Sequence, residues 1–247
     1  MSLRENSVVV ITGATSGLGL SLAKLFLDKN YVTVGISCTK KHWPNAKQET
    51  KANPQFVLFE TDVTNEAAVR RLFSNIIKKY GRIDVLINNA GYGGNLSVLD
   101  ETSSKEFQKH IANNLYSIFL TCKYVIPIFQ KQKSGWILNI SSMAGKRAVP
   151  KLAAYSASKF GVLALSQSIA KENAESGFKC VTVCPGGMNT KMRSDLFGQE
   201  DANKQQSPDF VAGVISKIID GEIKMESGGD IVIRHSQITA INPAPAA

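Results

Sequence analysis

A β-branched run, a glycine-rich turn and an amphipathic helix follow one another near the start of the chain, and this succession limits the possible folds most. Residues 8–12 (Val-Val-Val-Ile-Thr) indicate a buried strand. The turn reads Thr-Gly-Ala-Thr-Ser-Gly-Leu-Gly over residues 12–19, and apolar residues then recur at helical spacing as far as Asp28. Such a unit opens a dinucleotide-binding βαβ motif, because glycines let the backbone approach a pyrophosphate at the helix N-terminus. An ordinary glycine-rich turn is the alternative interpretation.

The rest of the chain alternates between strand-like runs and helical patterns. Further strands are predicted at residues 31–37, 56–60, 83–87, 136–140, 178–183 and 230–234. Helices are predicted at residues 65–80, 152–174 and 210–219, with one or two more within 101–131 and a short one within 42–55. This alternation predicts an α/β fold of three layers, a doubly wound parallel sheet with helices on both faces. We expect one domain over residues 1–247, with a mobile substrate-side segment at 190–210 and a frayed tail at 242–247.

Composition narrows the class of protein. The chain has 247 residues, of which 43% are hydrophobic, and no apolar run is long enough for a membrane span or a signal peptide, so we expect a cytoplasmic protein. The net charge is +9, but the lysines and arginines are scattered and no nucleic-acid-binding signature accompanies them. An anionic cofactor or substrate accounts for part of this excess. Four cysteines and three histidines show no zinc spacing, so no metal site is expected.

Tyr155 and Lys159 are the candidate catalytic pair. They lie four residues apart in a predicted helix, so both side chains occupy one face. A cation close to a phenol favours the phenolate, and a tyrosine tuned in this way can act as a general acid/base near neutral pH. Ser142 follows the strand at residues 136–140, where its hydroxyl can meet the same substrate oxygen. The alternative is that Tyr155 is a half-buried aromatic and Lys159 a solvated helix lysine.

The end of the second predicted strand bears on the choice of dinucleotide. In a dinucleotide-binding fold an acidic residue there binds the adenosine ribose, but residues 35–41 read Gly-Ile-Ser-Cys-Thr-Lys-Lys. Because lysines attract a 2′-phosphate that a carboxylate would repel, this stretch favours NADP over NAD, unless its lysines are only solvated loop charges. Asp62 could accept from the adenine amino group or merely cap the next helix, and the small residues at 88–91 could lie against the cofactor. Asn114 is either a tolerated core polar group or a residue that holds a water in the site.

The motifs Thr-Gly-x-x-x-Gly-x-Gly at 12–19, Asn-Asn-Ala-Gly at 88–91, Tyr-x-x-x-Lys at 155–159 and Pro-Gly-x-x-x-Thr at 185–190 occur together with Ser142. In this order and spacing, over nearly the whole chain, they resemble the short-chain dehydrogenase/reductase family. The resemblance implies a Rossmann-type fold with a seven-stranded sheet in the order 3-2-1-4-5-6-7.

The resemblance also implies a role for each catalytic residue. Tyr155 would protonate the carbonyl oxygen as general acid/base, while Lys159 would lower its pKa and hold the nicotinamide ribose. Ser142 would hydrogen-bond the substrate oxygen and stabilise the developing alkoxide. Asn114 would hold a water that relays protons towards Lys159, and it fits the family's Asn-Leu pair better than its neighbour Asn113.

The resemblance further implies a set of cofactor contacts, which run from the phosphates to the nicotinamide. The expected residues are Gly13, Thr15, Ser16, Gly17, Leu18, Gly19, Ser37, Lys40, Asp62, Val63, Asn89, Ala90, Gly91, Tyr155, Lys159, Pro185, Gly186, Met188 and Thr190. Many NADP-using members of the family carry a basic residue in the glycine loop. This sequence departs from them, because it has Thr15 and Ser16 there.

We therefore expect an oxidoreductase that transfers a hydride between NADP(H), with NAD(H) as the alternative cofactor, and a carbonyl or secondary-alcohol substrate. A non-catalytic dinucleotide-binding sensor or scaffold on the same fold is the alternative hypothesis. The family's interface helices, which carry Tyr155 and Asn114, suggest a homodimer or homotetramer, with no nucleic-acid or membrane partner. The substrate pocket is expected near residues 92–95, 143–149 and 192–206. Within it, Lys146 and Arg147 indicate an anionic substrate or else lie in a solvent-facing loop.

Overall fold

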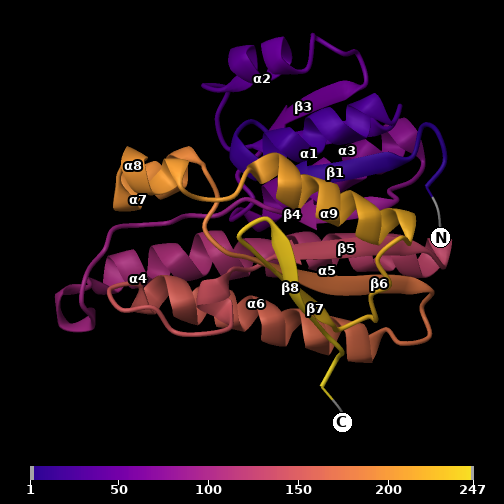
Figure 1. The fold of residues 1–247 in the computed structure, drawn as a ribbon. Helices are drawn as coiled ribbons and strands as arrows, with labels where there is room; N and C mark the ends of the chain where they lie inside the picture. Colours follow the sequence, from indigo (N-terminus) through magenta and orange to yellow (C-terminus); the bar gives the residue numbers. More distant parts are fainter. Residues whose placement is uncertain (1–2, 246–247) are drawn as a thin grey trace.

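A single eight-stranded sheet forms the centre of the computed structural model, which describes residues 3–245 (Figure 1). Its strand order is β3-β2-β1-β4-β5-β6-β7-β8, and the first seven of these strands are parallel. The predicted fold class and the predicted order of seven strands are therefore confirmed. The strands are β1 (Val8–Thr12), β2 (Val32–Ser37), β3 (Phe56–Glu60), β4 (Val85–Asn88), β5 (Gly135–Ile140), β6 (Phe178–Pro185), β7 (Asp230–Arg234) and β8 (Gln237–Asn242).

Helices cover both faces of this sheet, as the alternating pattern predicts. The helices are α1 (Gly17–Asp28), α2 (Trp43–Glu49), α3 (Glu66–Tyr80), α4 (Ser104–Ile111), α5 (Ser117–Gln132), α6 (Ala153–Glu172), α7 (Lys191–Phe197), α8 (Gln199–Asn203) and α9 (Pro208–Asp220). A π-helical turn, Ala112–Tyr116, joins α4 to α5, and a short 3-10 turn, Met143–Gly145, follows β5. The predicted helical stretch at 101–131 is thus two helices with an irregular turn between them.

The core consists of two apolar layers, one on each side of the sheet. Val9 and Ile11 of β1 face α1 and α9, where they pack with Leu22. Val8 and Val10 face the opposite layer, which α3, α5 and α6 supply. Because both faces are covered, the strands are apolar at successive positions rather than at alternate ones, which is why they could be recognised in the sequence.

The sheet has one strand more than the sequence predicts. Strand β8 pairs antiparallel with β7 through a two-residue turn at His235 and Ser236, both of which have positive φ. Such turns are normally signalled by Asn-Gly or Asp-Gly, and His-Ser gives no such signal. The side chains of β8 are also mostly exposed, so no buried apolar pattern marks the strand.

The segment that we expected to be mobile, residues 190–210, forms the short helices α7 and α8 at one end of the molecule (Figure 1). Its mobility stays a prediction. Of the tail expected to fray, Asn242 closes β8 and 243–245 have no regular structure, while 246–247 lie outside the described residues. Across residues 3–245, no helix is both long and apolar enough to cross a bilayer, and no group of three or more His, Cys, Asp or Glu side chains could hold a metal ion.

Asp84 offers a test of how the middle of the sheet is held. Its buried carboxylate accepts from the main-chain N–H of Val8 at 2.8 Å and pairs with Arg82. Asp84→Ala would leave the buried N–H without a partner, so we expect a loss of about 3 kcal/mol in the free energy of unfolding, measured by urea denaturation. Asp84→Asn, which keeps an acceptor oxygen, should lose less than half as much. Equal losses in the two variants would contradict this assignment.

Candidate active site

The candidate site lies where the parallel strands end and the strand order reverses, between β1 and β4. In open α/β sheets, ligands bind beyond the carboxyl ends of the strands at such a point. Four segments meet there: the glycine loop after β1, residues 89–92 after β4, residues 141–147 after β5 and residues 186–190 after β6. The first turns of α6 bring Tyr155 and Lys159 to the same place.

A groove of about 230 Å³ runs between these segments. The structure brings together most of the residues that the sequence predicted for the site, and those that line the groove are Gly13, Ser16, Gly17, Leu18, Asn89, Ala90, Gly91, Ser142, Tyr155, Lys159, Pro185, Gly186, Met188 and Thr190. The predicted site residues outside this lining are Thr15, Gly19, Ser37, Lys40, Asp62, Val63 and Asn114.

The floor of the groove is bare backbone, because two loops approach each other closely. A Cβ added at Gly13, where φ is +67°, would lie 3.0 Å from the Cα of Ala90, and one added at Gly19 would lie 2.0 Å from the Gly13 carbonyl oxygen. Thr12 ties the loops together, since its Oγ1 accepts from the N–H groups of Asn89 and Ala90, each at 2.9 Å. The Asn89 side chain donates to the carbonyl oxygens of Thr12 and Gly13, so it fixes the loops as well as lining the groove.

The N-terminus of α1 opens onto this groove. Its N-cap residue, Ser16, makes no side-chain cap hydrogen bond, and the first turn of the helix contains no acidic residue. The first N–H groups of a helix have no partner within it and carry partial positive charge. Together with the bare floor of the groove, this arrangement fits the pyrophosphate of a dinucleotide.

Tyr155 and Lys159 share one face of α6, as predicted, with the Lys159 Nζ 5.8 Å from the centre of the Tyr155 ring. Lys159 is 4% exposed and donates from Nζ to the Ile140 carbonyl oxygen at 2.9 Å. Burial lowers the pKa of Lys159 to about 8. Burial also raises the pKa of the Tyr155 phenol, an effect that its hydrogen bond with Ser142 opposes. The structure of the protein alone therefore does not bear out the prediction that Lys159 lowers the Tyr155 pKa, because its ammonium group is directed to a strand carbonyl and the phenol is desolvated.

Asn114 lies in the π-helical turn and is fully buried. Its Oδ1 accepts from the N–H of Tyr92 at 2.7 Å, and its Nδ2 donates to the Tyr92 carbonyl oxygen at 3.0 Å and to Ser158 Oγ at 3.1 Å. The side chain therefore holds the loop after β4 against α6. The rival Asn113 instead donates to the Lys109 carbonyl oxygen of its own helix.

The adenosine end of the site contains an acidic residue that the sequence analysis missed. Ser37 Oγ accepts from Trp43 Nε1 at 2.7 Å, and the Lys40 Nζ lies 5.6 Å from the centre of the Trp43 ring. Glu60, at the end of β3, places its Oε2 3.5 Å from Lys40 Nζ. Because β2 and β3 are neighbours in the sheet, an acid from β3 stands beside the end of β2, and only the strand pairing reveals it.

Asp62 does not cap the next helix, which was one of the two roles predicted for it. Its Oδ1 accepts from the N–H and the hydroxyl of Thr64, at 2.9 and 2.7 Å, in a local turn. Asn65 caps α3 instead, by accepting from the Ala68 N–H. Contact with an adenine therefore stays a prediction for Asp62.

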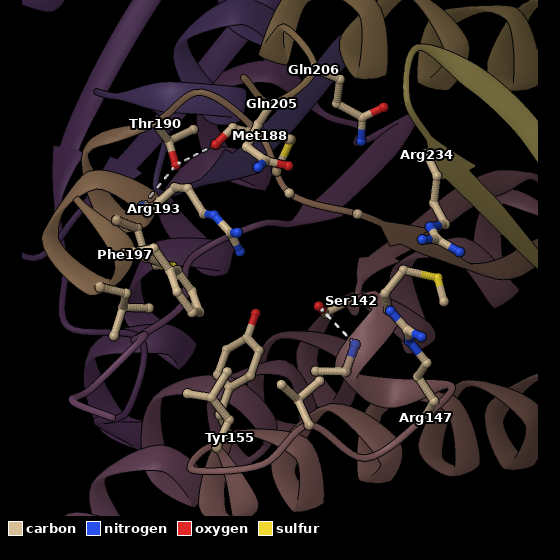
Figure 2. Close-up of a pocket in the computed structure, with 18 of the residues that line it drawn as sticks. Ser142, Arg147, Tyr155, Met188, Thr190, Arg193, Phe197, Gln205, Gln206 and Arg234 are labelled. Atoms are coloured by element: carbon tan, nitrogen blue, oxygen red, sulfur yellow. Dashed lines mark hydrogen bonds between the residues drawn. The ribbon is translucent and has the colours of Figure 1, made fainter. Parts of the chain in front are cut away.

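A second cavity, of about 380 Å³, adjoins the groove at Ser142 and Tyr155 (Figure 2). Met143, Arg147 and Val149 line it from one predicted stretch, and parts of α7 and the residues after α8 line it from another. The expected region 92–95 lies elsewhere, since Tyr92 lines the groove and Asn95 a separate cavity. The predicted stretch 192–206 contains Arg193 and Phe197, but the sequence analysis missed four other lining residues: Leu152, Gly187, Arg234 and His235. The last two belong to the end of β7 and the unpredicted hairpin turn.

His110 is a further neighbour of Tyr155 that no sequence signal indicated. It is 3% exposed, and its ring lies 6.0 Å from the Tyr155 ring and 5.0 Å from the Tyr92 ring. Burial lowers the pKa of His110, with Glu106 opposing the shift, so the ring is neutral at pH 7. A neutral His110 packs beside the phenol without adding charge to the site.

Comparison with known proteins identifies the class to which this fold and site belong. A family model described as short chain dehydrogenase matches residues 7–201. The chain belongs to the short-chain dehydrogenase family. It is 33% identical over 247 aligned residues to 2-(R)-hydroxypropyl-CoM dehydrogenase from Xanthobacter autotrophicus, an alignment that covers 95% of this chain and 99% of the relative.

Solved structures agree with this assignment. Levodione reductase has a TM-score of 0.88 at 24% identity, with 94% of this chain and 97% of that chain covered, which shows the common fold. The structure of ElxO with NADP bound has a TM-score of 0.85 at 27% identity and covers 92% of this chain and 96% of its own. The protein is thus an oxidoreductase of a hydride-transferring family, with a nicotinamide dinucleotide as cofactor and a small molecule as substrate.

The buried charge of Lys159 predicts an unusual dependence of stability on pH. Between pH 8 and 10.5 the unfolded chain still binds this proton while the folded chain has released it, so the contribution of Lys159 to stability rises with pH across that window. We expect Lys159→Met to be more stable than the wild type by about 1–3 kcal/mol at pH 7, and to lose this advantage as pH rises to 10.5. The measurement is urea denaturation over this pH range.

Lys171→Met is the matched control, because Lys171 lies on the same helix and is exposed. Its stability relative to the wild type should not change across the same pH range. A pH-independent difference between Lys159→Met and the wild type would show that the pKa of Lys159 is not lowered.

Proposed function

We propose that the protein interconverts a carbonyl compound and its secondary alcohol with NADP(H), and that Tyr155 is the general acid/base. One observation carries this proposal: Ser142 and Tyr155 line both the groove at the glycine loop and the larger cavity beside it. A substrate in the larger cavity would meet both hydroxyls at the place where it meets the nicotinamide. Met188 and Thr190 also line both spaces, which suits residues that would contact the carboxamide.

When bound, a nicotinamide dinucleotide would supply the hydride-transfer chemistry at the substrate carbon. The residues of the chain supply binding and the proton. Tyr155 donates its phenolic proton to the carbonyl oxygen during reduction, while Ser142 hydrogen-bonds the same oxygen and stabilises the developing negative charge. Since burial raises the Tyr155 pKa, the phenol is protonated at neutral pH and has a proton to donate to the carbonyl oxygen.

Lys159 and Asn114 would resupply the proton. A Cβ added at Gly91 would lie 3.2 Å from Asn114 Oδ1 and 3.7 Å from Lys159 Nζ, so both atoms border the same small space. We place a relay water there in the proposed mechanism. When the nicotinamide ribose is bound, the Lys159 ammonium group would leave the Ile140 carbonyl oxygen and hydrogen-bond the ribose. Its positive charge would then stabilise the phenolate of Tyr155.

We also propose that the protein forms a homodimer or homotetramer and that it binds neither nucleic acid nor a membrane. Three exposed aromatic side chains support self-association: Tyr116, Phe119 and Phe160 are 41%, 42% and 44% exposed. They lie on the turn and the two helices that flank the site. Light scattering of the purified protein gives its mass directly. A cytoplasmic location also stays a prediction.

Tyr155→Phe tests the proposed chemistry. We expect NADPH-dependent reduction of a panel of ketones and aldehydes to fall by about 10²–10⁴-fold, because the general acid is lost. Binding of NADPH, followed by its fluorescence, should remain, since the groove backbone is intact. Turnover close to that of the wild type would refute the role of Tyr155. Cofactor binding by the wild type without turnover on the whole panel would favour a sensor or scaffold instead.

Lys40 and Glu60 test the preference for NADP over NAD. The absence of an acid at the end of β2 supports NADP, whereas Glu60 partly neutralises Lys40. We expect Lys40→Ala to weaken NADPH binding by about 3- to 10-fold with little change for NADH, as suits the loss of one exposed charge near a phosphate. Glu60→Gln should strengthen NADPH binding, measured by titration calorimetry. Parallel changes for both dinucleotides would contradict a role for this pair in selectivity.

A further inference from the structure

One wall of the substrate cavity carries two arginines with no acidic partner. Arg147 follows the 3-10 turn after Ser142, and Arg234 is the last residue of β7. In Figure 2 both side chains reach the cavity from the side opposite Arg193 and Phe197, with Ser142 and Tyr155 between the two walls. Within residues 3–245, neither guanidinium group has a carboxylate oxygen within 4.0 Å, nor any side-chain hydrogen bond.

The third arginine of the cavity lining and the lysine next to Arg147 have acidic partners, which sets these two apart. Lys146 pairs with Asp230 at 2.8 Å and does not line the cavity. Arg193 pairs with Asp201 and stacks on Phe197 with its guanidinium carbon 3.8 Å from the ring centre. The described lining of the cavity contains no Asp or Glu, so its two unpaired arginines leave a net positive charge facing the substrate.

Packing on a glycine and strand pairing fix the position of Arg234. A Cβ added at Gly186 would lie 3.2 Å from Arg234 Cγ, so the stem of the arginine packs on the backbone that follows β6. Arg234 pairs with Gln237 across the hairpin turn, which prevents the end of β7 from moving away. Gly186 also lines the cofactor groove, but neither arginine does. The two guanidinium groups are therefore placed for the substrate and not for the phosphates of the dinucleotide.

We propose that Arg147 and Arg234 form a subsite for an oxyanion group, so that the substrate is a carbonyl compound or alcohol bearing a carboxylate, sulfonate or phosphate. This inference rests on the proposed function of the site. A planar guanidinium donates two parallel hydrogen bonds to such a group, and two guanidinium groups on one wall can share it. Bound there, the anion positions the carbonyl group beneath Ser142 and Tyr155. The cavity volume of about 380 Å³ limits the substrate to a small molecule.

The test uses matched substrates that differ only in charge. The probes are methyl ketones with two to four methylene groups between the carbonyl and a carboxylate, together with their methyl esters, and analogues with a sulfonate or a phosphonate. We expect kcat/KM with NADPH to be higher for the acids than for their esters. In Arg147→Gln, Arg234→Gln and the double variant, the ratio of acid to ester should fall by about 10- to 100-fold, the range expected for the loss of charge-assisted hydrogen bonds.

Arg71→Gln is the control, since Arg71 is exposed on α3 and lies outside the cavity lining. Its ratio of acid to ester should match that of the wild type. An acid-to-ester ratio near one in the wild type, or a ratio that survives in the double variant, would overturn the subsite. Comparison of the three anions shows which oxyanion the subsite prefers.

A binding measurement separates failure of the subsite from failure of the proposed function. Calorimetry of the acids and esters with NADP-loaded Tyr155→Phe requires no turnover. If no probe is reduced by the wild type, yet acids bind this variant and bind more weakly when both arginines are replaced, the subsite stands and the proposed chemistry fails. If esters are reduced as well as acids, the chemistry stands and the subsite fails. If no acid binds at millimolar concentration, the subsite is refuted.

Discussion

The close contact between the loop after β1 and the loop after β4 determines the geometry on which the rest of the site depends. The Thr12 hydroxyl accepts hydrogen bonds from two N–H groups of the neighbouring loop, and Gly13 places no side chain between the two loops. The groove floor is therefore polar backbone held at fixed spacing, and an extended anionic cofactor can lie directly on it. A side chain larger than hydrogen at Gly13 or Gly19 would force the loops apart and displace Asn89, which lines the groove.

Local patterns made most of the fold and the candidate catalytic pair predictable. The buried strands are apolar throughout, and the glycine loop and the Tyr155–Lys159 pair are defined by short spacings within single elements, so the sequence alone locates them. Features that arise from contacts between elements far apart in the sequence could not be predicted from the sequence alone. Glu60 meets Lys40 only because β2 and β3 are neighbours, and Arg234 reaches the cavity only because β7 ends beside β6. The hairpin that follows was hidden by a turn without glycine or asparagine.

The electrostatics of the protein alone differ from the simple picture of a lysine activating a tyrosine. Burial acts on both side chains, lowering the pKa of Lys159 to about 8 and raising that of Tyr155. In the proposed mechanism this state keeps the phenol protonated until a dinucleotide is present, because the ammonium group is occupied by the Ile140 carbonyl oxygen. In this mechanism the site would gain its acid/base character from the cofactor as well as from the spacing of two residues.

The antiparallel hairpin at the edge of the sheet has a consequence for how such an enzyme could diversify. It contributes Arg234 and His235 to the substrate cavity but no residue to the cofactor groove. The last strand pair is also the part of the chain furthest in sequence from the glycine loop. Evolution could therefore lengthen, shorten or recharge this C-terminal hairpin and change which molecules are accepted while the dinucleotide remains bound as before. Grafting hairpins from related chains onto this scaffold would be an economical route to new selectivity.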